Sequence, residues 1–68
     1  MADTVFKKIE LVGTSPNSFD DAVSNAVAKA GESIHGISWF EVVELRGSVA
    51  EGKVKQFQAT VRIGFKVD

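Results

Sequence analysis

The most regular pattern in the chain is an alternation of apolar and polar positions over residues 53–67. From position 57 onwards the odd-numbered positions are apolar: Phe57, Ala59, Val61, Ile63, Phe65 and Val67. The even-numbered positions are mainly polar: Gln56, Gln58, Thr60, Arg62 and Lys66. A period of two predicts a β-strand with one buried face, and the odd-numbered set is expected to meet the core.

A second pattern, with a helical period, covers residues 19–34. Its apolar positions form one stripe: Phe19, Ala22, Val23, Ala26, Val27, Ala30 and Ile34. This stripe predicts an amphipathic helix that covers a sheet. Ser15-Pro16 is a favourable start for the helix, and Ser18 is a weaker rival as the N-cap. Gly36 is expected to end it.

Two further segments are strand-like, Thr4–Val12 and Ile37–Val49, because both are rich in β-branched and aromatic residues. The short polar stretch Ala50-Glu51-Gly52 is expected to join the last two strands as a hairpin. The order is therefore β-α-β-β. We predict an α+β domain in which a three-stranded antiparallel sheet carries one helix on one face.

The stretch ISWFEVVELRG, residues 37–47, breaks the alternation because bulky apolar groups point to both sides. If Phe40 and Val42 face the helix, the other face carries Trp39, Glu41, Val43 and Leu45. We favour this arrangement, which would let Glu41 pair with Arg62 across the strands. The alternative buries Trp39 in the core, but it buries Glu41 there as well, which is costly. A bulge near Arg46-Gly47 would reverse the local facing.

Chain length and composition point to self-association. The chain has 68 residues, no Cys and a single His, His35. A domain of this size buries only about 60% of its unfolded surface, and many small domains rely on disulfides, metals or oligomerisation. With no Cys there is no disulfide and no thiolate metal site, so oligomerisation is the expected support.

The charge balance argues against nucleic acid as a partner. The formal net charge is −1, and the pairs Lys7-Lys8 and Lys53/Lys55 are too sparse for a basic stripe. The N-terminal segment MADTVFKKIE shows no signal peptide and no membrane span, so a cytoplasmic location is the default expectation.

Candidate catalytic groups are few, and we expect no enzyme activity. His35 lies at the predicted end of the helix, where interaction with the helix dipole is the simpler role. Glu41 and Glu44 would point to opposite faces of one strand, so they do not form an acid/base pair. A flat aromatic ring (Trp39), an amide (Gln58) and a cation (Arg46) suit a binding site better.

Three segments together resemble the dodecins, a family of small flavin-binding proteins. They are IELVGTSPNSFDDAV, ISWFEVVELRG and FQATVRIGFKVD. The resemblance runs from about Val5 to Asp68. It implies a β-α-β-β fold with the sheet wrapped partly around the helix. It also implies a homododecamer with paired flavins in pockets between subunits.

The resemblance further implies roles for particular residues. Trp39 takes the position that stacks on the isoalloxazine ring, and Gln58 the position that hydrogen-bonds its polar edge. Arg46 takes a position that meets the flavin phosphate. Lys66 takes a basic position near the C-terminus that is commonly arginine in the family, so it keeps the charge but not the bidentate geometry. The implied ligand is FMN, riboflavin or FAD. Coenzyme A is a second candidate, through basic residues near the helix end, where this chain carries Lys29 and His35.

Overall fold

The computed structural model describes residues 3–68 and contains one helix and three strands. The strands are β1 (Val5–Ser15), β2 (Ile37–Ala50) and β3 (Lys53–Val67), and the helix is α1 (Phe19–Gly31). The element order β-α-β-β is the one predicted, and β3 has the predicted bounds. The strand β1 continues three residues beyond its predicted end at Val12.

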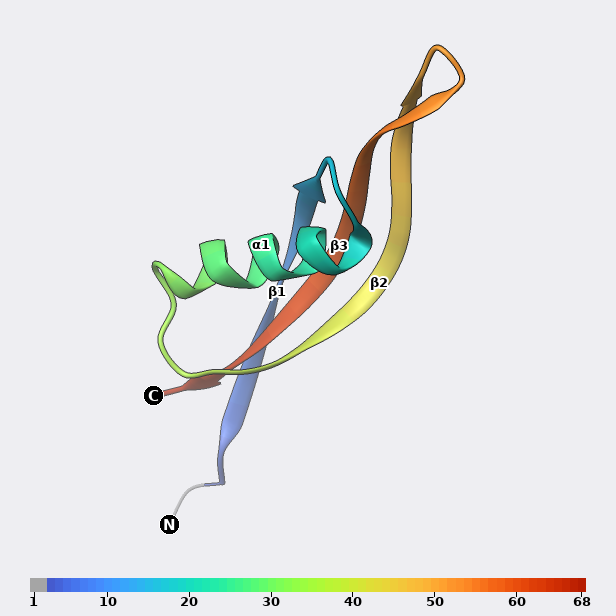
Figure 1. Ribbon diagram of the computed structural model, residues 1–68. Helices are drawn as coiled ribbons and strands as arrows, with labels where there is room; N and C mark the ends of the chain where they lie inside the picture. Colours follow the sequence, from blue (N-terminus) through green and yellow to red (C-terminus); the bar gives the residue numbers. More distant parts are fainter. Residues whose placement is uncertain (1–2) are drawn as a thin grey trace.

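The sheet is antiparallel throughout, with the order β1-β3-β2, so the last strand of the chain is the central one. The helix α1 crosses one face of the sheet, as Figure 1 shows, and the β2–β3 hairpin extends beyond both the helix and the end of β1. Ala50 pairs with Lys53, and the two residues between them both have positive φ. This is the geometry of a two-residue type I′ hairpin turn.

The helix begins at the weaker of the two predicted caps and ends earlier than expected. Ser18 is the N-cap, and its hydroxyl oxygen accepts a hydrogen bond from Asp21 N at 3.0 Å. Ser15 closes the preceding turn instead, because its Oγ accepts from Asn17 N at 2.9 Å. The prediction that Gly36 ends the helix was wrong, since α1 ends at Gly31. Gly36 has φ 75° and turns the chain into β2.

The core lies where α1 packs against β1 and β3. Its buried apolar residues are Ala22, Ala26, Ala30, Ala59, Val61 and Ile63. The odd-numbered face of β3 therefore meets the helix, as predicted. The approach is close, because a Cβ at Gly13 of β1 would overlap the carbonyl oxygen of Ala22. The largest of these side chains is an isoleucine, so the protomer buries only a small apolar core.

The pairing of β2 with β3 is irregular at three places, and the irregularity that changes the facing of the site residues lies at Val43, three residues before the predicted bulge near Arg46-Gly47. Val42 lies opposite Val61 and Glu44 lies opposite Thr60, so Val43 is the extra residue. Because one inserted residue shifts the alternation by one, Leu45 lies opposite Ala59 on the helix side of the sheet. The prediction that Leu45 shares the face of Trp39 was therefore wrong.

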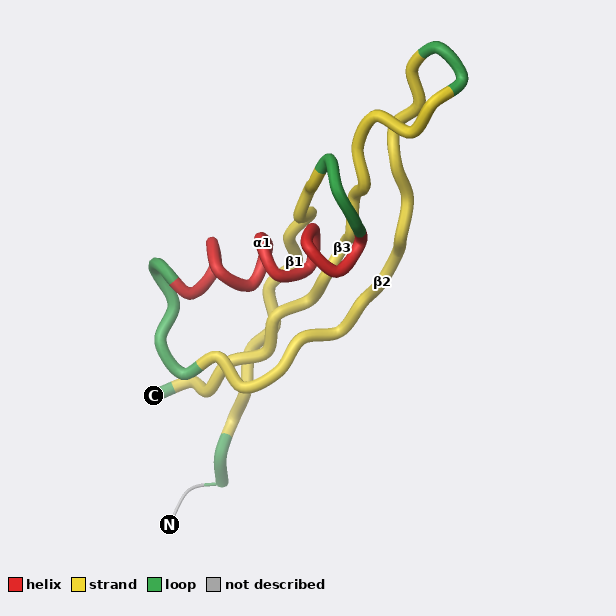
Figure 2. Tube along the Cα trace, viewed as in Figure 1, coloured by secondary structure: helices red, strands yellow, loops and turns green. Residues whose placement is uncertain are grey.

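The helix leaves the β2 side of its own sheet face uncovered. It packs mainly on β1 and β3 and touches β2 little. Phe40, Val42 and Leu45 therefore stay about half exposed, although they share a face with the core. Figure 2 shows the hairpin reaching past the rest of the chain, and the principal extents are 58 × 20 × 13 Å. The radius of gyration is 14.3 Å, against roughly 11 Å for a compact domain of this length.

Candidate ligand-binding site on the outer face of the sheet

The outer face of the sheet, which lies opposite α1, carries the even-numbered residues of β1 and β3 and the polar part of β2. Strand pairing arranges these residues in rows across the sheet. One row places Trp39 and Lys8 on either side of Gly64, and another places Arg46 and Thr14 on either side of Gln58. The preferred placement of Trp39, outside the monomer core, is confirmed.

The indole of Trp39 lies directly over Gly64 of the central strand. A Cβ at Gly64 would overlap three ring atoms, Cε2, Cζ2 and Cδ2. The edge of the indole is held by Phe6 of β1, with ring centroids 5.2 Å apart and an interplanar angle of 67°. This edge-to-face geometry is a favourable one for aromatic pairs. Trp39 nevertheless keeps 36% of its surface exposed, so a flat aromatic surface remains available to a ligand.

Glu41 fixes the polar end of the indole. Trp39 Nε1 donates a hydrogen bond to Glu41 Oε2 at 2.9 Å. Lys8 Nζ lies 3.2 Å from the same oxygen. The hydrogen bond from Trp39, followed by the one from Lys8, lowers the pKa of the Glu41 carboxyl below its ordinary value.

The predicted pairing of Glu41 with Arg62 was wrong, although the two residues lie directly opposite each other in the register. Arg62 Nε donates instead to Glu10 Oε1 at 3.0 Å. The central strand offers Arg62 an acidic neighbour on each side, and Glu41 is already held by Trp39 and Lys8. The sequence could suggest one pair but not the competing neighbour from β1.

The second feature of the outer face is a polar cluster of Arg46, Gln58 and Gln56. Arg46 Nε donates to Gln58 Oε1 at 2.7 Å. Gln58 Nε2 donates in turn to Gln56 Oε1 at 2.8 Å. The structure thus brings together two of the four predicted site residues. The guanidinium also lies near a carboxylate, with Arg46 Nη1 3.9 Å from Glu44 Oε1.

Trp39 does not join this polar cluster within one protomer. Trp39 lies opposite Gly64, while Arg46 lies opposite Gln58, six residues away along β3. At the rise of an antiparallel strand this separation is about 20 Å. A ligand ring stacked on Trp39 therefore cannot have its edge bound by Gln58 of the same chain. The outer face therefore carries the indole and the polar cluster as two separate candidate half-sites.

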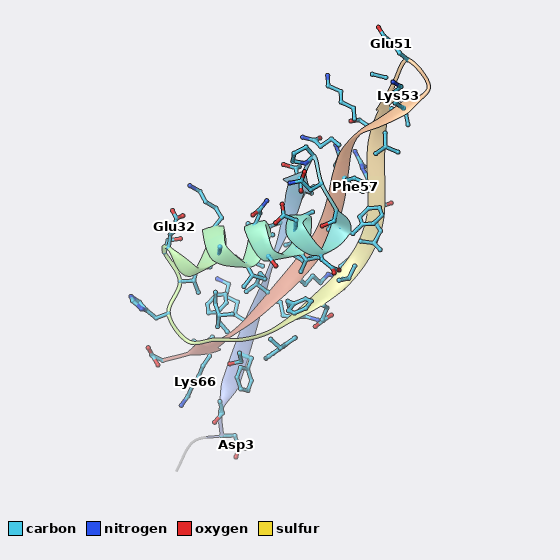
Figure 3. The ribbon with its side chains drawn as sticks, viewed as in Figure 1. Asp3, Glu32, Glu51, Lys53, Phe57 and Lys66 are labelled. Atoms are coloured by element: carbon cyan, nitrogen blue, oxygen red, sulfur yellow. The ribbon has the colours of Figure 1, made fainter. Side chains whose placement is uncertain are left out.

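Lys66, the fourth predicted residue, lies near the Trp39 end of the sheet. It is opposite Phe6 in β1, and Figure 3 shows it at the far end of β3 from Phe57 and the hairpin residue Lys53. Lys66 also lines a shallow depression of about 410 Å³ together with Lys7 and His35. Lys66 is therefore remote from Arg46 and belongs with Trp39 or with this depression.

Phe6, Lys8 and Gly64 complete the surroundings of Trp39, and the sequence analysis did not single them out. Phe6 and Lys8 belong to β1, and their nearness to β2 follows only from the strand order. In the sequence, Gly64 is one of several scattered glycines, which are typical of turns and bulges. A correct strand register would have placed the large aromatic Trp39 opposite Gly64. That pairing would have drawn attention to Gly64 as part of the site.

Within residues 3–68 no three His, Cys, Asp or Glu side chains lie close enough together to hold a metal ion. The one described helix, α1, is also too short and too polar to cross a membrane.

The fold and the outer face define a class of small β-α-β-β proteins that present an indole, an amide and a guanidinium on the uncovered face of the sheet. A family model described as Dodecin matches residues 5–68. The chain belongs to the dodecin family.

Two relatives show how similar this chain is to other members of the family. The chain is 41% identical over 64 residues to the dodecin of Thermus thermophilus, covering 94% of this chain and 93% of the relative. It is 30% identical to the calcium dodecin of Mycobacterium tuberculosis, covering 94% and 90%. Among solved structures, the dodecin of Streptomyces coelicolor superposes with a TM-score of 0.95 at 37% identity, covering 100% of this chain and 97% of the other.

Proposed function

We propose that this protein binds and stores a flavin between the subunits of a homo-oligomer, without turning it over. FMN is the leading candidate, and riboflavin and FAD offer the same ring. The observation that carries the proposal is the indole of Trp39, which is fixed on three sides and exposed on its outward face. A fixed flat surface suits a planar ring ligand, because little conformational entropy is lost on binding.

Stacking on Trp39 accounts for both storage and protection. An aromatic pair contributes roughly 0.5–1.5 kcal/mol beyond the burial of its area. The electron-rich indole in contact with an excited flavin donates an electron to it, and the return of that electron to the indole restores both groups to their ground states without emission or photochemistry. A protein that only stores the flavin needs no further catalytic group.

The separation of the two half-sites supports a site shared between protomers. The polar cluster lies about 20 Å from the indole along β3, so a second protomer would bring its own Gln58 and Arg46 to the ring. The Gln58 amide suits the hydrogen-bonding edge of the isoalloxazine, and the Arg46 guanidinium suits a phosphate. A two-fold arrangement of outer faces would satisfy both copies at once.

The shape and the exposed apolar residues of the protomer also support its assembly into an oligomer. The protomer is elongated, and Phe40, Val42 and Leu45 form an apolar strip that its own helix leaves uncovered. Apolar area of this kind is normally covered by a partner. We propose a homododecamer, as the family membership suggests, and we place it in the cytoplasm, the location that the cysteine-free sequence favours.

The test is a fluorescence titration of FMN with the purified protein, with its mass measured by light scattering. We expect strong quenching of FMN emission. Trp39→Ala should weaken binding and restore much of the emission, and Trp39→Phe should retain more of the binding than of the quenching. FMN emission that stays unchanged at saturating protein would refute the proposal.

A second ligand, coenzyme A, is favoured by one observation. The depression of about 410 Å³ near the end of α1 is lined by two lysines, Lys7 and Lys66, together with His35 and the acidic Asp68, and the lysines are suitable partners for a phosphate. Lys29 lies outside it and pairs with Glu32 at 3.4 Å. Calorimetric titration with coenzyme A tests this candidate. Lys7→Ala should weaken coenzyme A binding and leave FMN binding unchanged.

A further inference from the structure

The pair formed by Trp39 and Gly64 is the most demanding contact on the outer face. Gly64 is buried although it lies on the outer face of the sheet, because the indole covers it. A glycine in a strand interior normally costs stability, since it has no side chain to pack and more entropy to lose. A cross-strand aromatic that covers the glycine offsets this cost.

Gly64 determines how near the indole comes to the sheet. Any Cβ at position 64 would overlap Cε2, Cζ2 and Cδ2 of Trp39, so even alanine would lift the ring away from the backbone of β3. The exposed face of the indole would then stand further out, and the space left between it and a facing partner would be narrower.

Glu41 determines the orientation of the ring within this contact. Its carboxylate accepts the hydrogen bond from Trp39 Nε1 at 2.9 Å, and Lys8 holds the same carboxylate from β1 at 3.2 Å. Without this bond, only the contacts with Gly64 and Phe6 would restrain the side-chain torsions of Trp39. The two residues act on different degrees of freedom of one ring, its height and its direction.

We propose that Gly64 and Glu41 are positioning residues that set the height and orientation of the Trp39 ring, and so the width of the slot that admits a planar ligand. This inference rests on the proposed function, since the slot is the one that would hold the flavin ring. The position of the indole itself does not depend on any ligand. It can therefore be measured before a flavin is added.

The first experiment uses the full-length protein without ligand. Trp39 is the only tryptophan in the chain, so its emission and its quenching by acrylamide report on this site alone. Gly64→Ala should shift the emission to longer wavelength and raise the acrylamide quenching constant. Gly31→Ala is the matched control, since among residues 3–68 a Cβ there meets nothing within 4 Å beyond its chain neighbours and the backbone of its own helix. Equal behaviour of the two alanine variants would overturn the proposal.

A double-mutant cycle keeps the test informative if Gly64→Ala folds poorly. If position 64 must be glycine only because of the indole, Gly64→Ala should lower Tm in the parent but not in a Trp39→Ala background. Alanine in that background should be neutral or stabilising, because it restricts the unfolded chain more than glycine does. An equal loss of Tm in both backgrounds would show that the backbone of β3, and not the indole of Trp39, requires glycine at position 64.

Glu41 is tested by two variants of graded severity. Glu41→Gln keeps a carbonyl acceptor for Trp39 Nε1, whereas Glu41→Ala removes it. We expect Glu41→Ala to lower the fluorescence anisotropy of Trp39 and Glu41→Gln to restore most of it. If both variants retain the anisotropy of the parent, Glu41 has no positioning role.

FMN binding then separates the inference from the proposed function. In a parent that binds FMN, Gly64→Ala should weaken binding roughly five- to tenfold by displacing the stacking surface. If a variant with a displaced indole keeps the FMN affinity of the parent, Gly64 does not control the width of the slot. A parent that fails to bind FMN, while Gly64→Ala still moves the Trp39 signals, would overturn the proposed function and leave the positioning roles standing.

Discussion

Arg46 and Gln58 are joined across the β2–β3 pair by a hydrogen bond of 2.7 Å, from Arg46 Nε to Gln58 Oε1. This bond orients the amide through Arg46 Nε and leaves the terminal guanidinium nitrogens, of which Nη1 lies 3.9 Å from Glu44 Oε1, exposed to an incoming anion. Because Gln58 Nε2 is held in turn by Gln56, the cluster is ordered before any ligand arrives. We therefore expect the cluster to distinguish ligands that share a ring but differ in charge.

We expect Arg46→Ala to weaken the binding of FMN about tenfold while changing riboflavin binding little, because a charge-assisted hydrogen bond to the phosphate is lost. Parallel fluorescence titrations with the two flavins measure this difference. Lys55→Ala, which removes an exposed cation near the hairpin, is the control and should leave both affinities unchanged. Equal weakening of FMN and riboflavin would contradict a phosphate role for Arg46.

The ion pair of Glu41 predicts an acid transition at Trp39. The pKa of Glu41 is lowered in the folded protein by Trp39, Lys8 and Arg62, the last of which is also bound to Glu10. A lowered pKa means that the carboxylate stabilises the fold fully above its ordinary value of 4.5. This contribution is lost as the pH falls through the folded pKa.

Trp39 emission followed from neutral pH down through the acid range should show this transition, since protonation weakens the bond to the indole nitrogen. Glu41→Gln should abolish it. Glu32→Gln, remote from the indole and paired with Lys29, should leave it in place. A transition that survives in Glu41→Gln would have to come from another carboxyl.

Val42 tests the apolar strip that α1 leaves uncovered. It lies opposite the buried Val61 but is itself 47% exposed. We expect Val42→Lys to shift the protein from the oligomer towards free protomers, because a lysine would place an unpaired charge in the covered surface. Light scattering measures the mass, and Ala28→Lys on the exposed side of α1 is the control. An unchanged mass for Val42→Lys would place the interface elsewhere.

Ser18 tests the helix start that the sequence analysis ranked second. Its hydroxyl is the N-cap acceptor, so Ser18→Ala should lower the free energy of unfolding by about 1 kcal/mol. Urea denaturation at one fixed protein concentration measures this loss, since association shifts apparent stability. Ser24→Ala, at an exposed position inside α1, should be neutral or slightly stabilising.

The helix and the central strand were predictable because each has a clear period. The stripe of alanines and valines in α1 and the odd-numbered face of β3 meet in the core as expected. The end of the helix could not be predicted in the same way. Ile34 continues the apolar stripe beyond Gly31, and it still packs against the core from the turn that follows the helix.

The residue types of the candidate site could be predicted from the sequence, but their arrangement in space could not. The outward position of Trp39 followed from the polar neighbours on its face, and Arg46 and Gln58 proved to be neighbours. Leu45 was placed on the wrong face because a bulge at Val43 gives no periodic signal of its own. Glu41 pairs with Lys8 and not with Arg62. The sequence analysis missed this pair because Lys8 belongs to a strand distant in sequence.

The sequence by itself therefore determined the elements, the core face of β3 and the residue types available for binding, because periodicity and residue chemistry are local properties. Only the tertiary structure decided that β3 is central, that Gly64 lies beneath the indole and that Trp39 stands far from Gln58. These relationships depend on strand order, register and the local irregularities in the pairing of β2 with β3. Such features are set by long-range packing, which no short stretch of sequence encodes.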